Sequence, residues 1–479
     1  MNEGLVMKTL FLQVPSFDGF DGGAGSRYQA KREIRSFWYP TWLAQPAALV
    51  PGSRVLDAPA DGLHAEETLA IAVQYELVIM HTSTPSFPSD AHFAERLKAL
   101  NPAVLVGVVG AKVAVDPHNS LAASDSLDFV CREEFDFTCK EIAEGKPFSE
   151  IRGLSYRLPD GSIEPNEARP ILEDMDALPF VAPVYKRDLK IGNYFIGYLK
   201  HPYVLIYTGR GCRSRCTFCL WPQTVGGHRY RVRSVANGLA EVKWIRDNLP
   251  DVKELMFDDD TFTDFRPRVE AIARGLGELG VTWSCNAKAN VPYSTLKIMK
   301  DNGLRLLLVG YESGDNQILI NIKKGLRTDI ARRFSDDCRQ LGIKIHGTFI
   351  LGLPGETKET IEKTIEYAKE INPHTIQVSL AAPYPGTTLY QQAVENGRLE
   401  ENKVIHLVSK EGVQLAAIGY PHLSREEIYH QLETFYKRFY FRPSKIREIV
   451  REMLVSWEMT RRRLREGVEF FRFLPTHDA

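Results

Sequence analysis

Residues 203–219 read YVLIYTGRGCRSRCTFC, an apolar segment followed by a loop that carries three cysteines. The apolar segment, residues 203–207, predicts a β-strand, and the loop spaces Cys212, Cys216 and Cys219 as C-x3-C-x2-C. Cysteine thiolates are the usual ligands of iron–sulfur clusters. Three thiolates leave one iron of a 4Fe–4S cluster without a protein ligand, and an open coordination position is typical of a metal site that carries out chemistry. The loop therefore predicts a reactive cluster.

The open iron of such a cluster can be chelated by the amino and carboxylate groups of S-adenosylmethionine (SAM). An electron from the cluster then breaks a carbon–sulfur bond and yields a 5'-deoxyadenosyl radical, while the protein supplies position and excludes water. Spacing alone leaves two alternatives, a structural zinc site or three unrelated thiols. Zinc normally takes a fourth Cys or His, and His228 is the only nearby candidate.

The segment that follows the cysteine loop alternates between apolar runs and helical patterns. Six strands are predicted, at residues 203–207, 254–258, 281–285, 305–309, 344–350 and 375–380. Helices are predicted between them, at residues 234–248, 267–279, 294–302, 328–341 and 357–371. This order predicts a partial (β/α)6 TIM-like barrel over residues 200–396. In such barrels the functional residues lie at the carboxyl ends of the strands, and the cysteine loop follows the first strand.

The N-terminal part, residues 1–147, shows a second alternation of strands and helices. It predicts a Rossmann-like, doubly wound parallel sheet, with a long loop at residues 15–39. Ligands of such sheets bind at the carboxyl ends of the strands. Small, polar or turn-forming residues follow the predicted strands there: Ser16, Thr82, Ser83, Thr84 and Gly110.

Two further segments complete the predicted organisation. Residues 148–199 are expected to be a linker with a small hairpin around Pro159-Asp160-Gly161. Residues 397–479 are expected to form a C-terminal helical cap, with helices at residues 424–435 and 443–471. This cap is rich in arginine and aromatic residues. A basic amphipathic helix can make a peripheral membrane contact, but we favour a cap whose aromatic side chains pack on the barrel and whose arginines face water.

Composition limits the class of protein. The 479-residue chain is 44% apolar and 25% charged, which is typical of a globular protein of two or three domains. Its formal net charge of −1 argues against nucleic acid as a partner. Uninterrupted apolar runs of about 18 residues are absent, and residues 1–14 lack the features of a signal peptide. We expect a cytoplasmic protein, with the inner membrane surface as the one further location to consider.

Several motifs resemble those of the radical SAM superfamily, and the similarity extends over residues 200–395. The first is the cysteine loop itself, with the aromatic Phe218 before the last cysteine. The others are FDDDTF at residues 257–262, GYESG at 310–314, FILGLPGE at 349–356 and PYPGTTLY at 383–390. The resemblance implies SAM contacts from Phe218, Asp258, Asp259, Lys288, Glu312 and Gly352. Asp260 and Tyr384 are the candidate catalytic residues. For Asp260, plain helix capping is the alternative, and for Lys288 it is an ordinary surface position.

Within this superfamily the chain resembles the cobalamin-binding-domain group, in which a Rossmann-like domain precedes the barrel. The resemblance implies cobalamin as a third cofactor, held by Ser16, Thr82, Ser83, Thr84 and Gly110. One motif departs from other cobalamin proteins, because D-x-H-x-x-G is absent and Asp61-Gly62-Leu63-His64 has the wrong order. The alternative is a domain that only packs on the barrel.

At a finer level, the loops at residues 9–28, 35–42 and 57–67 resemble hopanoid-biosynthesis radical SAM proteins of the cyclitol-ether branch. This implies contraction of the glucosamine ring of a glucosaminyl bacteriohopanetetrol to a cyclitol ether. It also implies a hopanoid glycolipid substrate and an external electron donor. Two alternatives stay open: a cobalamin-dependent radical SAM methyltransferase acting on a lipid or natural product, and a zinc-stabilised binding protein without turnover.

Overall fold

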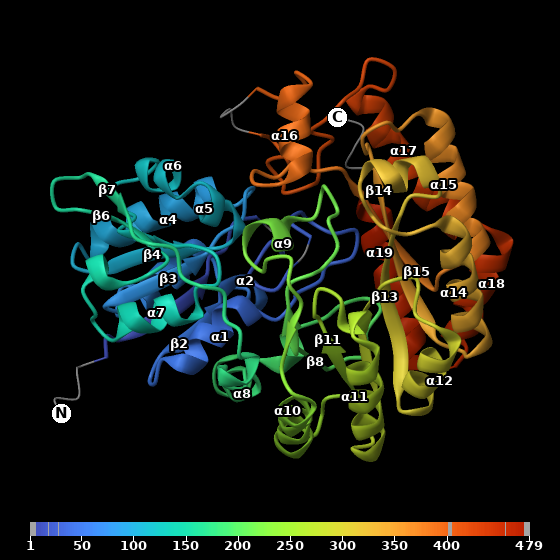
Figure 1. The fold of residues 1–479 in the computed structure, drawn as a ribbon, viewed down its shortest axis with the longest axis horizontal. Coiled ribbons are helices and arrows are strands. Elements are labelled where there is room, and N and C mark those ends of the chain that lie inside the picture. Colours follow the sequence, from blue (N-terminus) through green and yellow to red (C-terminus); the bar gives the residue numbers. More distant parts are fainter. Residues whose placement is uncertain (1–5, 18, 27, 401–404, 456, 474–479) are drawn as a thin grey trace.

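Two β-sheets lie side by side in the computed structural model, and helices pack around both of them (Figure 1). The structure describes the chain except for residues 1–5, 18, 27, 401–404, 456 and 474–479. The first sheet belongs to the N-terminal part and the second to the central part. This α/β architecture, with C-terminal helices behind the second sheet, confirms the predicted fold class.

The first sheet has seven strands in the order β2-β1-β3-β4-β5-β6-β7. Its first five strands are parallel: β1 (Thr9–Gln13), β2 (Arg54–Asp57), β3 (Leu77–His81), β4 (Leu105–Val109) and β5 (Phe129–Cys131). The accompanying helices are α1 (Thr41–Leu49), α2 (Ala58–Asp61), α3 (Ala65–Ala72), α4 (Phe87–Leu100), α5 (Ala111–Val115), α6 (Pro117–Ala122) and α7 (Asp136–Ala143). Apolar side chains cover both faces, as expected for a parallel sheet with helices on each side.

The hairpin predicted inside the linker forms, but its place differs from the prediction. Strand β6 (Leu154–Arg157) pairs antiparallel with β5, and β7 (Ile163–Pro165) pairs with β6. The first sheet therefore continues to residue 165. An unpaired strand edge exposes a row of backbone donors and acceptors, and the hairpin covers that edge. Sequence pattern does not show which edge a hairpin joins. The following segment carries the short helix α8 (Ala182–Asp188).

The second sheet is an open barrel of six parallel strands in the order β15-β14-β13-β12-β11-β8. Its strands are β8 (Tyr203–Ile206), β11 (Glu254–Phe257), β12 (Trp283–Ala287), β13 (Leu304–Glu312), β14 (Lys344–Leu351) and β15 (Thr375–Leu380). Its helices are α9 (Leu220–Thr224), α10 (Val235–Asn248), α11 (Arg266–Glu278), α12 (Tyr293–Asp301), α13 (Asn316–Asn321), α14 (Thr328–Gln340), α15 (Lys358–Ile371) and α16 (Thr388–Glu395). A two-stranded ribbon, β9 (Gly209–Arg210) with β10 (Arg231–Val232), flanks the cysteine loop.

The C-terminal region forms three helices, α17 (Arg425–Tyr440), α18 (Pro443–Met453) and α19 (Trp457–Phe473). The prediction of one helix over residues 443–471 is wrong, because the chain turns between α18 and α19. Apolar residues recur every three or four positions across this turn, so periodicity does not reveal it. Helix α17 packs on β15 and α15, and its Tyr436 hydroxyl accepts from the amide of Val378 on β15 at 2.9 Å. Within the described chain, every helix is too short or too polar to cross a bilayer.

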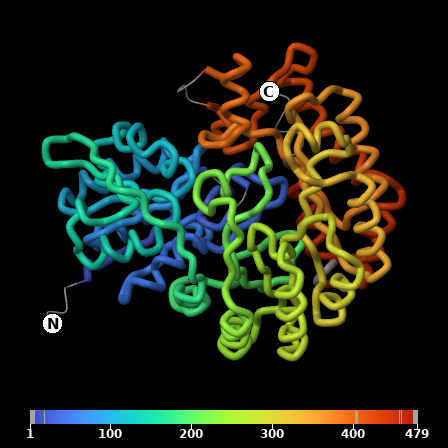
Figure 2. The backbone as a smooth tube through the Cα atoms, viewed as in Figure 1, coloured from blue at the N-terminus to red at the C-terminus, as the bar shows by residue number. Residues whose placement is uncertain are grey.

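The long loop after β1 leaves the first sheet and crosses to the barrel, where Figure 2 shows it in dark blue. Three contacts tie it down: the amide of Lys31 donates to the carbonyl of Gly412, that of Phe37 to Phe195, and the Arg32 guanidinium bonds Gln377 on β15. The loop therefore contributes to the interior of the barrel.

Candidate active site

A cavity of about 320 Å³ lies inside the barrel. The three cysteines of the loop after β8 line it, as do side chains from β12, β13, β14 and β15. On β14 the lining residues are His346, Thr348, Phe349 and Ile350, and the first, second and last of these alternate as residues on one face of a strand do. His346 stands near the start of β14, so the cavity extends from the carboxyl ends of the strands deep into the barrel.

The side chain of Gln223 on α9 bonds the backbone of the cysteine loop. Its amide nitrogen donates to the carbonyls of Cys216 (3.2 Å) and Cys219 (2.7 Å), and its carbonyl oxygen accepts from the amide and hydroxyl of Thr388 (2.9 and 2.8 Å). Loop carbonyls without such partners would be costly to bury. Gln223 thus stabilises the loop and joins it to α16.

The side chain of His228, the candidate fourth zinc ligand, contacts backbone carbonyls of the same loop. Its Nδ1 lies 3.0 Å from the carbonyl oxygen of Ser214 and 3.3 Å from that of Cys212. Nδ1 faces these carbonyls, so Nε2 is the ring nitrogen that remains for another partner. Across the ranges that the structure describes, no three His, Cys, Asp or Glu side chains are grouped closely enough to hold one metal ion.

The same residues fit a 4Fe–4S cluster. In such a cluster each thiolate binds a different iron, so the sulfurs stand further apart than around a single ion. Cys212, Cys216 and Cys219 all face the cavity, with the first two buried and the third half-buried. The hydroxyl of Thr261 lies 3.8 Å from the Cys212 sulfur. Three thiols that face one cavity and lack a fourth protein ligand suit a cluster with one open iron.

The three aspartates after β11 have different environments. Asp258 accepts from the Tyr207 hydroxyl (2.8 Å) and the Asn286 amide (2.7 Å), and Asp259 accepts from the Thr208 amide (2.6 Å) and hydroxyl (2.9 Å). Both are fully buried and neither lines the cavity. Burial raises the pKa of Asp259. The predicted SAM contacts of Asp258 and Asp259 are therefore not supported, since their hydrogen bonds brace neighbouring strand ends.

Asp260 does line the cavity, where its carboxylate accepts from the amide of Gly211 at 2.9 Å. Phe218 and Lys288 line it as well, and the Lys288 ammonium lies 2.7 Å from Asp264. Gly352 lies outside the cavity, beneath the C-terminal segment, where its carbonyl accepts from the Tyr420 hydroxyl. Tyr384 also stands outside the cavity lining. The roles predicted for Asp260, Phe218 and Lys288 remain predictions. Gly352 and Tyr384 do not line the cavity, so their predicted roles have no support from its geometry.

Glu312 meets a partner that sequence patterns did not indicate. Its carboxylate lies 2.7 Å from the ammonium of Lys324, and both residues line the cavity. Burial alone would lower the pKa of Lys324, but the adjacent Glu312 carboxylate outweighs it and raises the pKa, so the ammonium stays charged. A Cβ at Gly310 would lie 2.3 Å from the Glu312 carboxylate. Glycine at this position leaves the room that the pair occupies.

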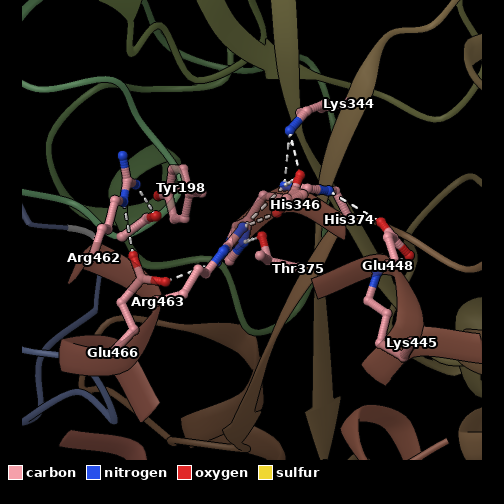
Figure 3. Close-up of polar contacts among 12 residues, drawn as sticks. Tyr198, Lys344, His346, His374, Thr375, Lys445, Glu448, Arg462, Arg463 and Glu466 are labelled. Atoms are coloured by element: carbon pink, nitrogen blue, oxygen red, sulfur yellow. Dashed lines mark hydrogen bonds and ion pairs between the residues drawn. The ribbon is translucent and has the colours of Figure 1, made fainter. Parts of the chain in front are cut away.

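The long loop after β1 and the base of the barrel add further cavity residues. Arg32 is buried and bonds the Gln377 carbonyl oxygen at 2.6 Å. The His346 ring stacks on Tyr198 at 3.9 Å, and its Nδ1 lies 2.8 Å from the Thr375 hydroxyl (Figure 3). Burial holds the pKa of His346 well below its usual value, so the imidazole is neutral. Its Nε2 and the indole nitrogen of Trp38 are buried and lack a hydrogen-bond partner within the described chain. Both atoms are thus available to a bound polar group.

A second candidate site lies at the carboxyl edge of the first sheet, where three predicted loops meet. The carboxylate of Asp90 accepts from the hydroxyls of Thr82 (2.7 Å), Ser86 (2.8 Å) and Ser16 (3.3 Å). Ser83 bonds Ser86, and Thr84 is half-buried. These loops therefore form one joined edge.

Two features of this edge suit a bound group. Both ring nitrogens of His81 are buried without a partner among the residues that the structure describes. Gly110 has a φ of +126°, and a Cβ there would lie 2.3 Å from the carbonyl oxygen of Thr82. Such a close approach is possible only for glycine. An unpaired buried imidazole at the carboxyl end of β3 fits a bound group with polar atoms.

The family model of the radical SAM superfamily matches residues 206–368, which include the three cysteines and the strands β11 to β14. The chain is a radical SAM enzyme. The cysteine loop and most of the barrel lie within the matched residues.

Two relatives illustrate the sequence similarity of this radical SAM enzyme. An uncharacterized methyltransferase of Pyrococcus horikoshii is 28% identical over 86% of this chain and 90% of the relative. The cytidylyl-2-hydroxyethylphosphonate methyltransferase of Streptomyces wedmorensis is 26% identical over 55% of this chain and 56% of the relative. The first of these matches spans both sheets.

Two solved structures share the fold over most of the chain. The radical SAM methyltransferase TsrM of Kitasatospora setae, solved with tryptophan and a SAM analogue, superposes with a TM-score of 0.66, at 14% identity over 91% of this chain and 89% of its own. The cobalamin-dependent SAM radical enzyme OxsB, solved with aqua-cobalamin and SAM, gives a TM-score of 0.68, at 15% identity over 96% of this chain and 72% of its own.

Proposed function

We propose that the protein is a cobalamin-dependent radical SAM methyltransferase. The support is the order of its parts, since a Rossmann-like sheet precedes a radical SAM barrel as in TsrM and OxsB. Several relatives with this barrel are named as methyltransferases. This reading is favoured over ring contraction, which none of these relatives' names mentions.

The observation that carries the proposal is the junction between the two candidate sites. Helix α5, which follows β4 and Gly110, packs against α9, which follows Cys219 directly. Beside this contact, Trp42 on α1 stacks on Trp221 on α9 with ring centroids 5.3 Å apart. The polar edge of the first sheet thus adjoins the cysteine loop. A cofactor on that edge would lie next to the cluster.

Each set of residues has a defined task in this proposal. Cys212, Cys216 and Cys219 hold the cluster, which supplies the electron that cleaves SAM. The Glu312–Lys324 pair presents opposite charges to the amino and carboxylate groups of SAM. The edge built by Ser16, Thr82, Ser83 and Gly110 would hold cobalamin, which would supply the methyl group. The His81 ring would donate a hydrogen bond to the bound cobalamin or accept one from it.

Anaerobic reconstitution with iron, sulfide, SAM and hydroxocobalamin tests the proposal. We expect the purified protein to retain cobalamin through gel filtration, with its visible absorption bands. Turnover should release S-adenosylhomocysteine together with a methylated product. A protein that forms 5'-deoxyadenosine but retains no cobalamin and releases no S-adenosylhomocysteine would contradict the methyltransferase assignment.

A second candidate is ring contraction of a glucosaminyl hopanoid, and one observation supports the lipid substrate that this reaction needs. A further cavity of about 250 Å³ shares Arg32, Tyr198 and His346 with the cavity of the cysteines. Its other walls are largely apolar and include Ile376, Val450 and Phe470. A substrate with a polar head and an apolar body suits two such neighbouring cavities. This arrangement supports a lipid substrate, whichever reaction the enzyme performs.

The two candidates differ in their products. In the ring-contraction scheme, the radical removes hydrogen from the non-anomeric sugar carbon beside the ring oxygen, and the anomeric carbon–oxygen bond breaks to give a ketone and an anomeric radical. That radical adds to the ketone carbon and closes a cyclopentane that carries an oxygen radical, which an electron from the external donor and a proton then quench. With glucosaminyl bacteriohopanetetrol deuterated at that carbon, we then expect deuterium in 5'-deoxyadenosine and no S-adenosylhomocysteine. Unlabelled 5'-deoxyadenosine would exclude the scheme.

A further inference from the structure

The C-terminal helices expose an unusual amount of apolar surface. In the described part of the chain, 14 large apolar residues are exposed, and nine of them fall within residues 441–471. These nine define the C-terminal apolar face: Phe441, Ile446, Val450, Leu454, Val455, Trp457, Leu464, Val468 and Phe471. Scattered exposed apolar residues are normal, but a contiguous group marks a contact surface.

The nine residues lie on α18, on α19 and in the turns beside these helices. On α18, Ile446 and Val450 follow the spacing of a helical stripe, which Leu454 continues just past the end of the helix, and on α19 Leu464, Val468 and Phe471 form a second stripe. The rings of Phe441 and Phe471 stack with centroids 6.0 Å apart and join the two stripes at one end. Leu454 and Trp457 stand at the turn between the helices, 81% and 79% exposed.

Exposed arginines accompany this face. Arg447 and Arg451 each follow a stripe residue of α18 by one position, and Arg461 and Arg472 are exposed on α19. Residues 441–473 contain nine Lys and Arg against five Glu, whereas the whole chain has a net charge of −1. The segment is therefore locally basic.

Three glutamates of the same helices make ion pairs, and Figure 3 labels two of them, Glu448 and Glu466. Glu448 lies 2.9 Å from Lys445 and 3.3 Å from His374, and Glu452 lies 2.7 Å from Lys344 on β14. Glu466 is buried and pairs with Arg462 and Arg463. The pairs of Glu448 with His374 and of Glu452 with Lys344 fix α18 to the barrel. They also leave arginine and apolar side chains to dominate the outer side.

From this arrangement we infer that α18 and α19 dock on the surface of an anionic phospholipid bilayer, with the C-terminal apolar face at the headgroup–acyl boundary. Apolar stripes flanked by arginines fit such an interface. Phe441, Ile446, Val450 and Phe471 also line the apolar cavity described above, so this cavity opens on the same face. A second copy of the chain fits less well, because a two-fold contact would bring the arginines of both copies together. The inference does not depend on which reaction the enzyme performs.

Co-sedimentation of the full-length protein with vesicles tests the inference. We expect binding to vesicles of equal parts phosphatidylcholine and phosphatidylglycerol, and at least about tenfold weaker binding to phosphatidylcholine alone. The fluorescence of Trp457 should be quenched by brominated lipid in the first vesicles. Equal sedimentation with and without vesicles would overturn the inference. So would a concentration-dependent dimer that forms without lipid through this face.

Substitutions on the face make the test specific. Leu454→Asp with Val468→Asp should weaken vesicle binding by at least about tenfold, because each change removes apolar surface from the boundary. Arg447→Gln should weaken it by about fivefold. Leu100→Asp is the matched control, since Leu100 is 61% exposed on α4 in the first domain and should leave binding unchanged. Vesicle binding that survives the Leu454 and Val468 changes would also overturn the inference, and circular dichroism checks that the variants fold.

Discussion

The Glu312 carboxylate and the Lys324 ammonium form a buried ion pair, 2.7 Å apart, inside the cavity that the three cysteines line. Glu312 ends β13 with a φ of +64°, an uncommon value for a residue with a side chain. Strained backbone of this kind concentrates at functional sites. The pair presents one anionic and one cationic group to whatever amino acid moiety enters the cavity.

Glu312→Gln should therefore weaken SAM binding by about tenfold, because charge-assisted hydrogen bonds contribute more than neutral ones. The Lys324 ammonium would also lose its partner. Equilibrium dialysis of the reconstituted protein against labelled SAM measures the effect, while iron and sulfide content should stay at the wild-type level. The exposed Glu278→Gln variant is the control. Wild-type affinity in Glu312→Gln would remove this residue from the SAM site.

Gln223→Ala should loosen the cysteine loop. The change removes hydrogen bonds to two cysteine carbonyls and to Thr388, and buried groups left unpaired cost about 1–3 kcal/mol. We expect faster loss of iron to a chelator, by at least about tenfold, in a protein that remains folded. Gln391→Ala, on the exposed side of α16, should match the wild type. Identical rates of iron loss would show that the loop does not need this clamp.

Arg210→Met should weaken the contact between the two domains. The guanidinium of Arg210 makes two hydrogen bonds to Asp136 on α7, at 2.6 and 3.1 Å, and both residues are buried. Removing it leaves a buried carboxylate, which costs about 3–5 kcal/mol in the free energy of unfolding. Arg229→Met breaks an exposed pair with Glu173 and should cost less than about 1 kcal/mol. Urea unfolding compares the two, and equal losses would refute the prediction.

The C-terminal helices should become less stable in mild acid. Burial lowers the pKa of His374 from 6.5 to about 4, against the opposing effect of Glu448 and Glu452. Unfolding therefore takes up a proton between these values, so the free energy of unfolding falls as the pH drops from about 6.5 to about 4. Between pH 7 and pH 5 the loss should be about 2 kcal/mol.

His374→Gln should flatten this part of the pH profile, whereas the exposed His430→Gln should not. Glu448 and Glu452 do not contribute to the change in the free energy of unfolding between pH 7 and pH 5. Their pKa values are lowered to about 2, so their contribution is lost only as the pH falls from about 4.5 toward 2. A wild-type slope in the His374→Gln variant would assign the acid sensitivity to another group.

Most strands could be predicted from the sequence because parallel strands buried on both faces read as short apolar runs. Thr375–Leu380 agrees with the prediction at both ends, and the cysteine loop follows β8 as expected. The hairpin at β6 and β7 was predicted, but not its pairing with β5, because strand pairing depends on tertiary contacts. The break between α18 and α19 was missed because the apolar repeat continues through it.

The cavity could be predicted only in part. The three cysteines, Phe218, Asp260, Lys288 and Glu312 all line it, and each lies in or near a motif at the end of a strand. Asp258 and Asp259 belong to the same kind of motif but turn away from the cavity, and sequence does not show side-chain direction in a loop. Arg32 and Trp38 reach the cavity on a loop of the first domain, so no local signal could place them there.

The most direct test of the account is electron paramagnetic resonance of the anaerobically reconstituted and reduced protein, combined with analysis of its products. The account predicts a 4Fe–4S signal that changes on addition of SAM, and formation of 5'-deoxyadenosine. Cys212→Ala, Cys216→Ala and Cys219→Ala should abolish both, whereas Cys285→Ala, a buried cysteine outside the loop, should retain both. A wild-type protein that takes up zinc in place of the cluster and forms no 5'-deoxyadenosine would contradict it.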